Sequence, residues 1–336
     1  MEYVDKSQLY PLLFKPIYME RMWGGTKMAS LPGRDVPESD LPIGESWELV
    51  DRDGEESVVT NGPLAGATIR QLIEHYGKGL VGSSFNGGKF PLLVKIIDAE
   101  KRLSLQVHPD QEACKRIGGG AEPKTEMWYI IKADPGAKIM AGISPTATKR
   151  LVVENMSSPS VEDYLQVFPS IPGDAYFITS GTLHAIGSGN LLLEIQQNSD
   201  TTYRASDWGR VDQHGKAREL HVEKALESIN FTDRTSPRIA GVSDIVDRNR
   251  KFPVVNRCPY FQVDDLRLVE PWRDDTGHSN SFHLVTAINK PVSIQCFSSE
   301  TIVLPPAVTC MIPAAVGPYQ IIPLEEGQSS VVRTSL

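Results

Sequence analysis

A side-chain amide and an imidazole stand two residues apart in residues 103–110, whose sequence is LSLQVHPD. Successive side chains of a strand point to opposite faces, so Ser104, Gln106 and His108 would share one face. The amide oxygen of Gln106 and a ring nitrogen of His108 could then meet one cation. A half-exposed edge strand without any ligand is the alternative interpretation of this stretch.

A carboxylate and a second imidazole follow along the chain. Lys124 and Glu126 stand two residues apart where an aromatic and apolar run begins, which puts both on one side of the next strand. His184 follows the Ser-Gly pair at residues 180–181, where the sequence predicts a hairpin turn and a return strand. A lone histidine is more often structural. Two His, one Glu and one Gln on neighbouring strands nevertheless offer the N and O ligands that suit a catalytic divalent metal such as zinc.

Two more charged residues lie inside apolar, strand-like runs. Lys95 is the one charge in residues 91–97, PLLVKII, and a buried lysine needs a partner such as an anion. Glu194 lies in residues 191–196, LLLEIQ, and shares a strand face with Gln196. Lys95 is therefore a candidate functional residue.

Short apolar runs bounded by turn formers must position these residues. The chain has 27 Gly and 24 Pro spread between such runs, a pattern typical of sheet sandwiches and barrels. Helical periodicity is rarer and predicts helices over residues 67–76, 110–117 and 219–229.

A polar stretch rich in Arg and Asp, residues 230–251, marks the expected domain boundary. The sequence thus predicts a mainly β protein with a few flanking helices. Its first domain would span residues 1–235 and carry the metal ligands, and a smaller C-terminal β domain without metal would span residues 250–336.

Composition narrows the classes of partner. The 336 residues include 42 Asp and Glu against 34 Lys and Arg, a net charge of −8. This acidic balance argues against nucleic acid or an anionic membrane as the main partner. The start of the chain has no secretory signal and no apolar run reaches the length of a membrane span, so we expect a cytoplasmic protein.

Four motifs, in this order along the chain, resemble type I phosphomannose isomerase, a zinc enzyme family of the cupin superfamily. They are QVHP at residues 106–109, EPKTEMW at 122–128, GTLHAI at 181–186 and YRASDWG at 203–209. The resemblance extends from WGG at residues 23–25 and GESWE at 44–48 to about Phe231, some two thirds of the chain. Only 57 residues separate Glu126 from His184, as in the short bacterial form of the family.

The resemblance implies a cupin-type jelly-roll barrel and one Zn²⁺ per chain. The implied ligands are Gln106, His108, Glu126 and His184. The implied pocket is lined by Lys95, Ser104, Lys124, Glu194 and Arg204, with Lys95 and Ser104 toward the phosphate of a small-molecule sugar phosphate. We further expect a monomer or a weak homodimer.

The expected reaction interconverts mannose 6-phosphate and fructose 6-phosphate by moving a proton between C1 and C2 through an enediolate. Arg204 would offer fixed positive charge to the developing oxyanion. Lys124 is the preferred base, because a nearby dication and Arg204 would favour its neutral form. Glu194 is the rival base, since burial would favour its protonated form, and a water activated by the metal is a third possibility.

Two other classes of protein stay open. A metal cupin of another reaction type, such as an iron oxygenase, would need two His and one carboxylate but neither Gln106 nor clustered cations. A non-catalytic sugar-binding cupin is the other, although all four ligand types are present. In the C-terminal third, His278 and His283 lack a paired carboxylate pattern, so a structural role is expected there.

Overall fold

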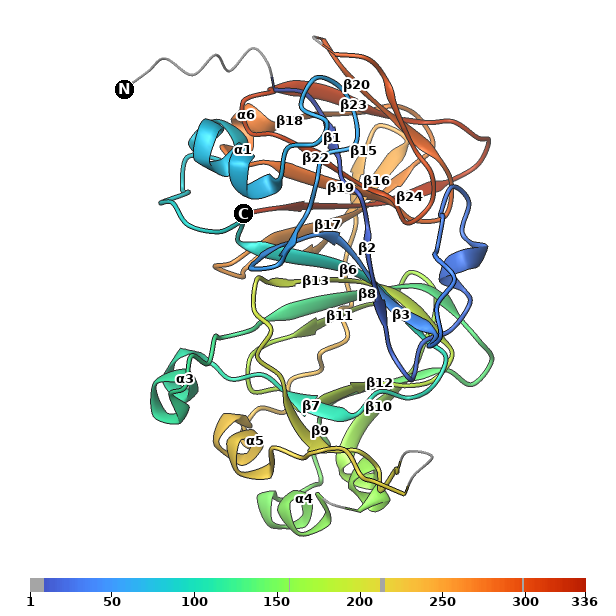
Figure 1. Cartoon of the computed structure of the whole chain (residues 1–336). Coiled ribbons are helices and arrows are strands. Elements are labelled where there is room, and N and C mark those ends of the chain that lie inside the picture. The colour runs from blue at the N-terminus through green and yellow to red at the C-terminus, as the bar shows by residue number, and fades with distance from the viewer. Residues whose placement is uncertain (1–8, 157, 212–214, 298) are drawn as a thin grey trace.

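Four antiparallel sheets stacked as layers make up most of the molecule (Figure 1). The computed structural model describes residues 9–156, 158–211, 215–297 and 299–336. From one end of the stack to the other, the sheets have five, six, seven and four strands (Figure 1). The mainly β fold expected from the strand-like runs is therefore confirmed.

The first pair of layers forms one sandwich. Its six-stranded sheet has the order β11 (Ala175–Ile178), β8 (Glu126–Ala133), β13 (Asn190–Gln197), β6 (Leu92–Ala99), β3 (Ile43–Leu49) and β2 (Ile17–Glu20). Its five-stranded sheet has the order β10 (Leu165–Pro169), β9 (Lys138–Ile143), β12 (His184–Ile186), β7 (Leu105–Val107) and β14 (Tyr203–Ser206).

The second pair of layers contains the C-terminal strands. The seven-stranded sheet has the order β1 (Leu12–Leu13), β22 (Thr309–Ile312), β19 (His283–Ala287), β24 (Ser329–Ser335), β17 (Gln262–Leu268), β16 (Asn249–Val255) and β15 (Asp244–Val246). The four-stranded sheet has the order β18 (Trp272–Asp275), β23 (Pro318–Pro323), β20 (Val292–Cys296) and β21 (Ile302–Leu304). A separate ribbon pairs β4 (Asp51–Arg52) with β5 (Glu55–Glu56).

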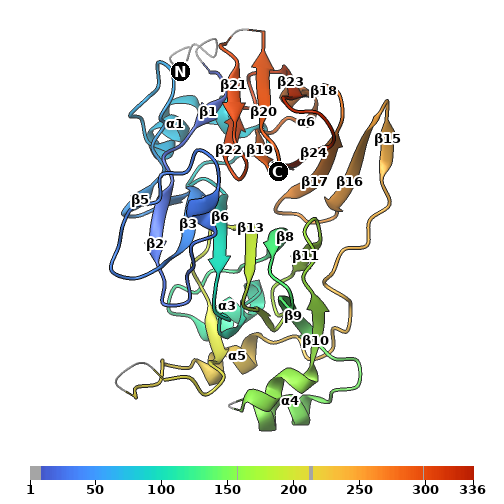
Figure 2. The ribbon, with the colours of Figure 1, turned by 90° about the vertical axis from the view of Figure 1, so that its right-hand side faces the viewer.

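Helices are short and lie at the periphery of the sheets (Figures 1 and 2). They are α1 (Ile69–Tyr76), α2 (Lys78–Val81), α3 (Gln111–Ile117), α4 (Lys149–Asn155), α5 (Val222–Ser228) and α6 (Thr276–Ser279), with the 3₁₀ turns η2 (Met28–Ser30) and η3 (Pro159–Tyr164). The three predicted helices correspond to α1, α3 and α5. In the described parts of the chain, none of the helices combines the length and apolar character needed to cross a bilayer.

Helix α1 illustrates how local sequence sets a boundary. Thr68 and Gln71 form a reciprocal capping box at its start, which satisfies backbone N–H groups that have no partner within the helix. Gly77 ends the helix with a φ of 47°, a conformation that favours glycine. The predicted start at residue 67 was therefore two residues early, because Thr68 caps the helix from outside.

The six-stranded sheet is buried on both faces, which explains its nearly continuous apolar strands. On β6, Leu92, Val94 and Ile96 belong to the core cluster shared with the seven-stranded sheet. Ile97, on the other face, belongs to the cluster between the six-stranded and five-stranded sheets. Lys95 shares this second face by strand parity, so the chemistry of the protein faces the five-stranded sheet.

Two local predictions are wrong. Residues 175–186 do not form a hairpin, because β11 pairs with β8 while β12 pairs with β7 and β9 in the other sheet. Gly181, at a φ of +87°, lies where the chain crosses between the sheets, and its N–H donates to the carbonyl of His108. The strand that would place Ser104, Gln106 and His108 on one face is also shorter than expected: it begins only at Leu105, and Leu103 packs in the cluster between the two sheets.

The start of the chain joins the C-terminal sheet. Leu12 and Leu13 of β1 pair with Met311 and Cys310 of β22. A single core cluster also includes buried side chains from both the six-stranded and the seven-stranded sheets. The division into residues 1–235 and 250–336 stays a prediction, and β1 is a segment that crosses it.

Candidate active site

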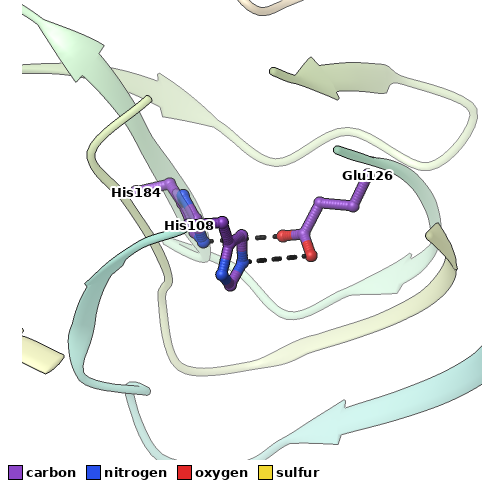
Figure 3. Close-up of side chains that lie close together, drawn as sticks. All are labelled: His108, Glu126 and His184. Atoms are coloured by element: carbon purple, nitrogen blue, oxygen red, sulfur yellow. Dashed lines mark ion pairs between the residues drawn. The ribbon is translucent and has the colours of Figure 1, made fainter. Parts of the chain in front are cut away.

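Two imidazoles and one carboxylate meet between the five-stranded and six-stranded sheets (Figure 3). His184 is the first residue of β12, Glu126 is the first residue of β8, and His108 follows β7 directly. His108 Nε2 lies 3.2 Å from Glu126 Oε2, and His184 Nε2 lies 3.5 Å from Glu126 Oε1. All three side chains are buried. Within the described ranges, this is the one group of at least three His, Cys, Asp or Glu side chains whose ligand atoms lie within 4.8 Å of one another.

Backbone carbonyls orient both imidazole rings. Nδ1 of His108 lies 3.0 Å from the carbonyl oxygen of Thr201, and Nδ1 of His184 lies 2.8 Å from that of Thr182. A carbonyl oxygen only accepts hydrogen bonds, so each Nδ1 carries the proton. Each Nε2 therefore presents its lone pair toward Glu126, which is the tautomer that a metal-binding histidine needs.

The protonation states of the three residues suit the same purpose. Burial, reinforced by the charge of Lys124, lowers the pKa of His108 to about 4. Burial also lowers the pKa of His184. Burial alone would raise the pKa of Glu126, but Lys124 and the two histidines outweigh it and hold that pKa well below its usual value. At neutral pH the cluster therefore consists of two neutral imidazoles and one carboxylate.

A metal ion fits this donor set. His108 Nε2 is buried and has no hydrogen-bond partner in the part of the chain that the structure describes, and the buried Glu126 Oε2 has Lys124 Nζ as its cationic neighbour. Leaving a buried polar atom without a partner is costly, and a cation bound between these two atoms would give His108 Nε2 a partner. Two imidazole nitrogens and a carboxylate oxygen are ligands that zinc accepts.

Gln106 lies next to this cluster. In the five-stranded sheet its Cα stands directly opposite that of His184. Its Nε2 donates to Ser104 Oγ at 3.0 Å, which assigns the other end of the amide as the acceptor. Ser104 is thus a residue that orients Gln106, and Gln106 as a fourth ligand stays a prediction.

Lys124 lies against the cluster. It is buried, and its Nζ is 2.9 Å from Glu126 Oε2. Lys124 lies two residues before Glu126, the first residue of β8, and both side chains line the same cavity. A basic group therefore lies beside the carboxylate of the candidate metal site.

Lys95 has two carboxylate partners on neighbouring strands. Its Nζ lies 3.2 Å from Glu194 Oε2 on β13 and 3.8 Å from Glu45 Oε2 on β3. Burial alone would lower the pKa of Lys95, but Glu194 and Glu45 outweigh it and raise that pKa. The anion that a buried Lys95 was predicted to need is thus present within the protein.

Glu194 and Glu45 are each held by an indole as well. Trp128 Nε1 donates to Glu194 Oε1 at 3.0 Å, and Trp47 Nε1 donates to Glu45 Oε2 at 2.8 Å. Both oxygens of Glu194 therefore have a partner. Burial opposes ionisation of Glu45, but Lys95 and Arg21 outweigh it and lower its pKa to about 2.

Arg204 projects from β14 of the five-stranded sheet, with its Cα opposite Gln106. Its Nη1 donates to the carbonyl oxygen of Glu219 at 2.7 Å. Its Nε is buried and has no hydrogen-bond partner among the residues described. Burial, followed by the charge of Arg218, lowers the pKa of Arg204.

One cavity of about 260 Å³ brings most of these groups together. Of the nine residues that the sequence singled out, all but His108 line it, and His108 contacts the lining residue Glu126. The cavity also has polar and aromatic lining residues that the sequence analysis did not assign to the site: Arg21, Trp23, Glu45, Asp200, Thr202 and Arg218. Trp23 and Glu45 lie within motifs of the family resemblance, whereas no pattern in the sequence marks Arg218.

The second sandwich holds a buried histidine of a different kind. His283 Nδ1 lies 2.7 Å from the hydroxyl of Tyr319, and its Nε2 lies 2.9 Å from Ser279 Oγ. Both ring nitrogens thus engage hydroxyl groups. These two contacts hold His283 in the core of the second sandwich, and the structural role of the C-terminal third stays a prediction.

Comparison with known proteins agrees with the geometry. Residues 12–135 match the model of the family described as phosphomannose isomerase type I, catalytic domain. The mannose-6-phosphate isomerase ManA of Bacillus subtilis strain 168 is 40% identical over 261 residues, which cover 77% of this chain and 79% of ManA.

Solved structures show the same architecture. The crystal structure of the mannose 6-phosphate isomerase from Bacillus subtilis superimposes with a TM-score of 0.84 at 29% identity, covering 97% of this chain and 99% of that one. A zinc-bound mannose 6-phosphate isomerase superimposes with a TM-score of 0.76 at 15% identity, covering 97% of this chain and 99% of that one. At that low identity, the second likeness shows the fold alone.

Proposed function

Because the chain belongs to the type I phosphomannose isomerase family, we propose that it interconverts mannose 6-phosphate and fructose 6-phosphate by proton transfer between C1 and C2. One observation carries this proposal: the buried cluster of His108, Glu126 and His184 opens on a cavity that also holds Lys124 and Arg204. A proton transfer beside a carbonyl needs a base and a positive charge near the oxygen atoms, and this cavity supplies both kinds of group.

The proposed cofactor is one Zn²⁺ per chain, held by His108, Glu126, His184 and Gln106. The zinc-bound relative in the comparison supports this choice of metal, as does the donor set. When bound, the metal would supply Lewis-acid polarisation of the substrate's carbonyl and hydroxyl oxygens. The carbonyl oxygens of Thr201 and Thr182 would keep the two imidazoles in the binding tautomer.

Lys124 is the proposed base. Its Nζ lies beside the carboxylate of Glu126, so it can reach a proton on a substrate carbon held next to the cluster. Glu194 is the second candidate, but its Oε1 already accepts a hydrogen bond from Trp128 and its Oε2 is ion-paired with Lys95. Lys124 lies against the metal cluster itself, where a substrate carbon next to the metal would be held, and this position favours Lys124.

Arg204 and the other wall residues would bind and orient the sugar. The unpartnered Nε of Arg204 offers a charged donor to the oxyanion that develops as the enediolate forms. Ser104 and Lys95 line the same cavity and would contact the substrate. The cytoplasmic location and the monomeric or weakly dimeric state stay predictions.

A combined metal and activity assay tests the proposal. Protein purified without chelator should contain about one equivalent of zinc and form fructose 6-phosphate from mannose 6-phosphate. Removal of the metal should abolish the activity, because no cation then polarises the substrate oxygens. Added Zn²⁺ should restore it. Isomerisation that persists in fully metal-free protein would contradict the proposed role of the metal.

A further inference from the structure

The cations of the cavity differ in how fully they are neutralised. Lys124 pairs with Glu126, Lys95 pairs with Glu194 and Glu45, and Arg21 shares Glu45 with Lys95. A lysine or arginine held by buried carboxylates attracts a further anion only weakly, because the carboxylates repel that anion. These three cations are therefore poor anchors for a phosphate group.

Arg204 and Arg218 are the two remaining cations of the cavity lining. Among the described residues, neither Glu nor Asp forms an ion pair with Arg204. Arg218 donates from Nε and Nη2 to Asp207, with a distance of 2.8 Å from Nε to Oδ2. Asp207 also forms an ion pair with Arg210, so one carboxylate is shared by two guanidinium groups.

This arrangement leaves a surplus of positive charge on one side of the cavity. The nearby positive charge of Arg218 contributes, after burial, to the lowered pKa of Arg204. Asp200 is the remaining acidic residue of the lining, and its side chain is exposed, so solvent screens its charge. Lining cations therefore outnumber lining carboxylates on this side before any metal is counted.

We propose that Arg218 anchors the phosphate group of the substrate, beside Arg204 and away from the metal cluster. The proposal rests on the proposed isomerase function and names a specificity residue for it. Asp207 already fixes the Arg218 guanidinium through Nε and Nη2, and among the described residues Nη1 makes no hydrogen bond, so Nη1 can donate to a phosphate oxygen. Pre-organisation of this kind limits the entropy lost on binding.

The substrate's shape agrees with this placement. The phosphate of a hexose 6-phosphate lies several bonds from C1 and C2, so its anchor must be separate from the residues that act on those carbons. Arg218 comes from the segment that precedes α5 and contacts neither His108 nor Glu126, yet it lines the same cavity. Ser104, which the family resemblance places toward the phosphate, is instead hydrogen-bonded to Gln106.

Replacing Arg218 by Gln gives the main test. For the zinc-loaded protein, we expect R218Q to raise the KM for mannose 6-phosphate about tenfold or more, with kcat within about threefold of the wild type. The Kd for inorganic phosphate, measured by calorimetry on the same protein, should rise by a similar factor. R218K should lie between the wild type and R218Q, because it keeps the charge but loses the fork.

Arg210 provides the matched control. It shares Asp207 with Arg218 and donates to the carbonyl oxygen of Arg102, but it does not line the cavity. R210Q should therefore keep both the KM for mannose 6-phosphate and the Kd for inorganic phosphate within about threefold of the wild-type values. Thermal unfolding of all three variants verifies that each one folds, and Asp207 keeps one arginine partner in each single variant.

Three results would overturn the anchor role: no phosphate binding by wild-type protein, an unchanged KM and Kd in R218Q, or an equal loss in R210Q. If S104A binds phosphate more weakly than the wild type while R218Q binds it equally well, Ser104 is the phosphate anchor instead. The two proposals fail separately. Wild-type protein that binds phosphate through Arg218 but forms no fructose 6-phosphate would refute the isomerase function and keep the anion site.

Discussion

Lys95 on β6 and Glu194 on β13 stand directly opposite each other in the antiparallel register, and Nζ of one lies 3.2 Å from Oε2 of the other. Glu45 on β3 reaches the same Nζ at 3.8 Å. Three adjacent strands of the six-stranded sheet are thus joined by one buried charge network on the cavity side. This network connects the wall of the cavity to the stability of the sheet.

Removing the central cation should destabilise the fold. We expect K95M to lower the free energy of unfolding by about 3 kcal/mol, because two buried carboxylates lose their cation. Urea unfolding measures this change. K132M is the matched control, since Lys132 lies in the same sheet, on β8, with its side chain exposed. Adding E194Q to K95M should recover part of the loss, and a K95M protein as stable as the wild type would contradict the network.

Replacing the shared carboxylate of the candidate metal cluster should release the metal. We expect E126Q to weaken zinc binding at least about tenfold and to abolish isomerisation, because a neutral amide replaces the charged oxygen ligand. Metal analysis after dialysis measures the bound zinc. E122Q is the control, since Glu122 is half exposed and pairs with Arg52 outside the cluster. Full zinc occupancy in dialysed E126Q would remove Glu126 from the ligand set.

Replacing the proposed base should affect turnover and leave the metal in place. We expect K124M to lower kcat by about 100-fold or more with unchanged zinc content, the scale of a lost general base. Steady-state kinetics and metal analysis on one preparation measure both quantities. K115M serves as control, because Lys115 is exposed on α3. Unaltered kcat in K124M would leave Glu194 as the candidate base.

The second sandwich should make the stability depend on pH. Burial and the charge of Arg333 lower the pKa of His283 from 6.5 to about 4, against the attraction of Asp274. Between these two values the unfolded chain binds a proton that the folded protein does not, so stability falls as the pH falls. Protonation of this residue alone should lower the free energy of unfolding by about 3 kcal/mol as the pH falls from 6.5 to 4.

Urea unfolding of wild type and H283Q across this pH range isolates the contribution. His108 and His184 titrate in both proteins, so their effects cancel in the difference. We expect the loss of stability on acidification to be about 2–3 kcal/mol smaller in H283Q than in the wild type. Parallel curves for the two proteins would show that His283 does not titrate as its burial implies.

Much of the site could be predicted because strand parity is local. The alternation in residues 191–196 places Glu194 and Gln196 on one face; Glu194 lines the cavity and Gln196 is buried. Lys124 and Glu126 likewise reach one cavity from the start of one strand. The apolar runs of β6 and β13 identified buried strands, although they did not indicate that both faces of the sheet are covered.

The remaining features depend on contacts between residues far apart in the chain. The sequence by itself determined which residues form strands and which side chains share a face, since both follow from neighbours along the backbone. Only the tertiary structure decided that Glu45 partners Lys95, that Gly181 carries the chain between sheets, and that Arg218 enters the cavity wall. These outcomes follow from how the layers pack, because burial selects charge partners by distance in space, and no local pattern encodes that distance.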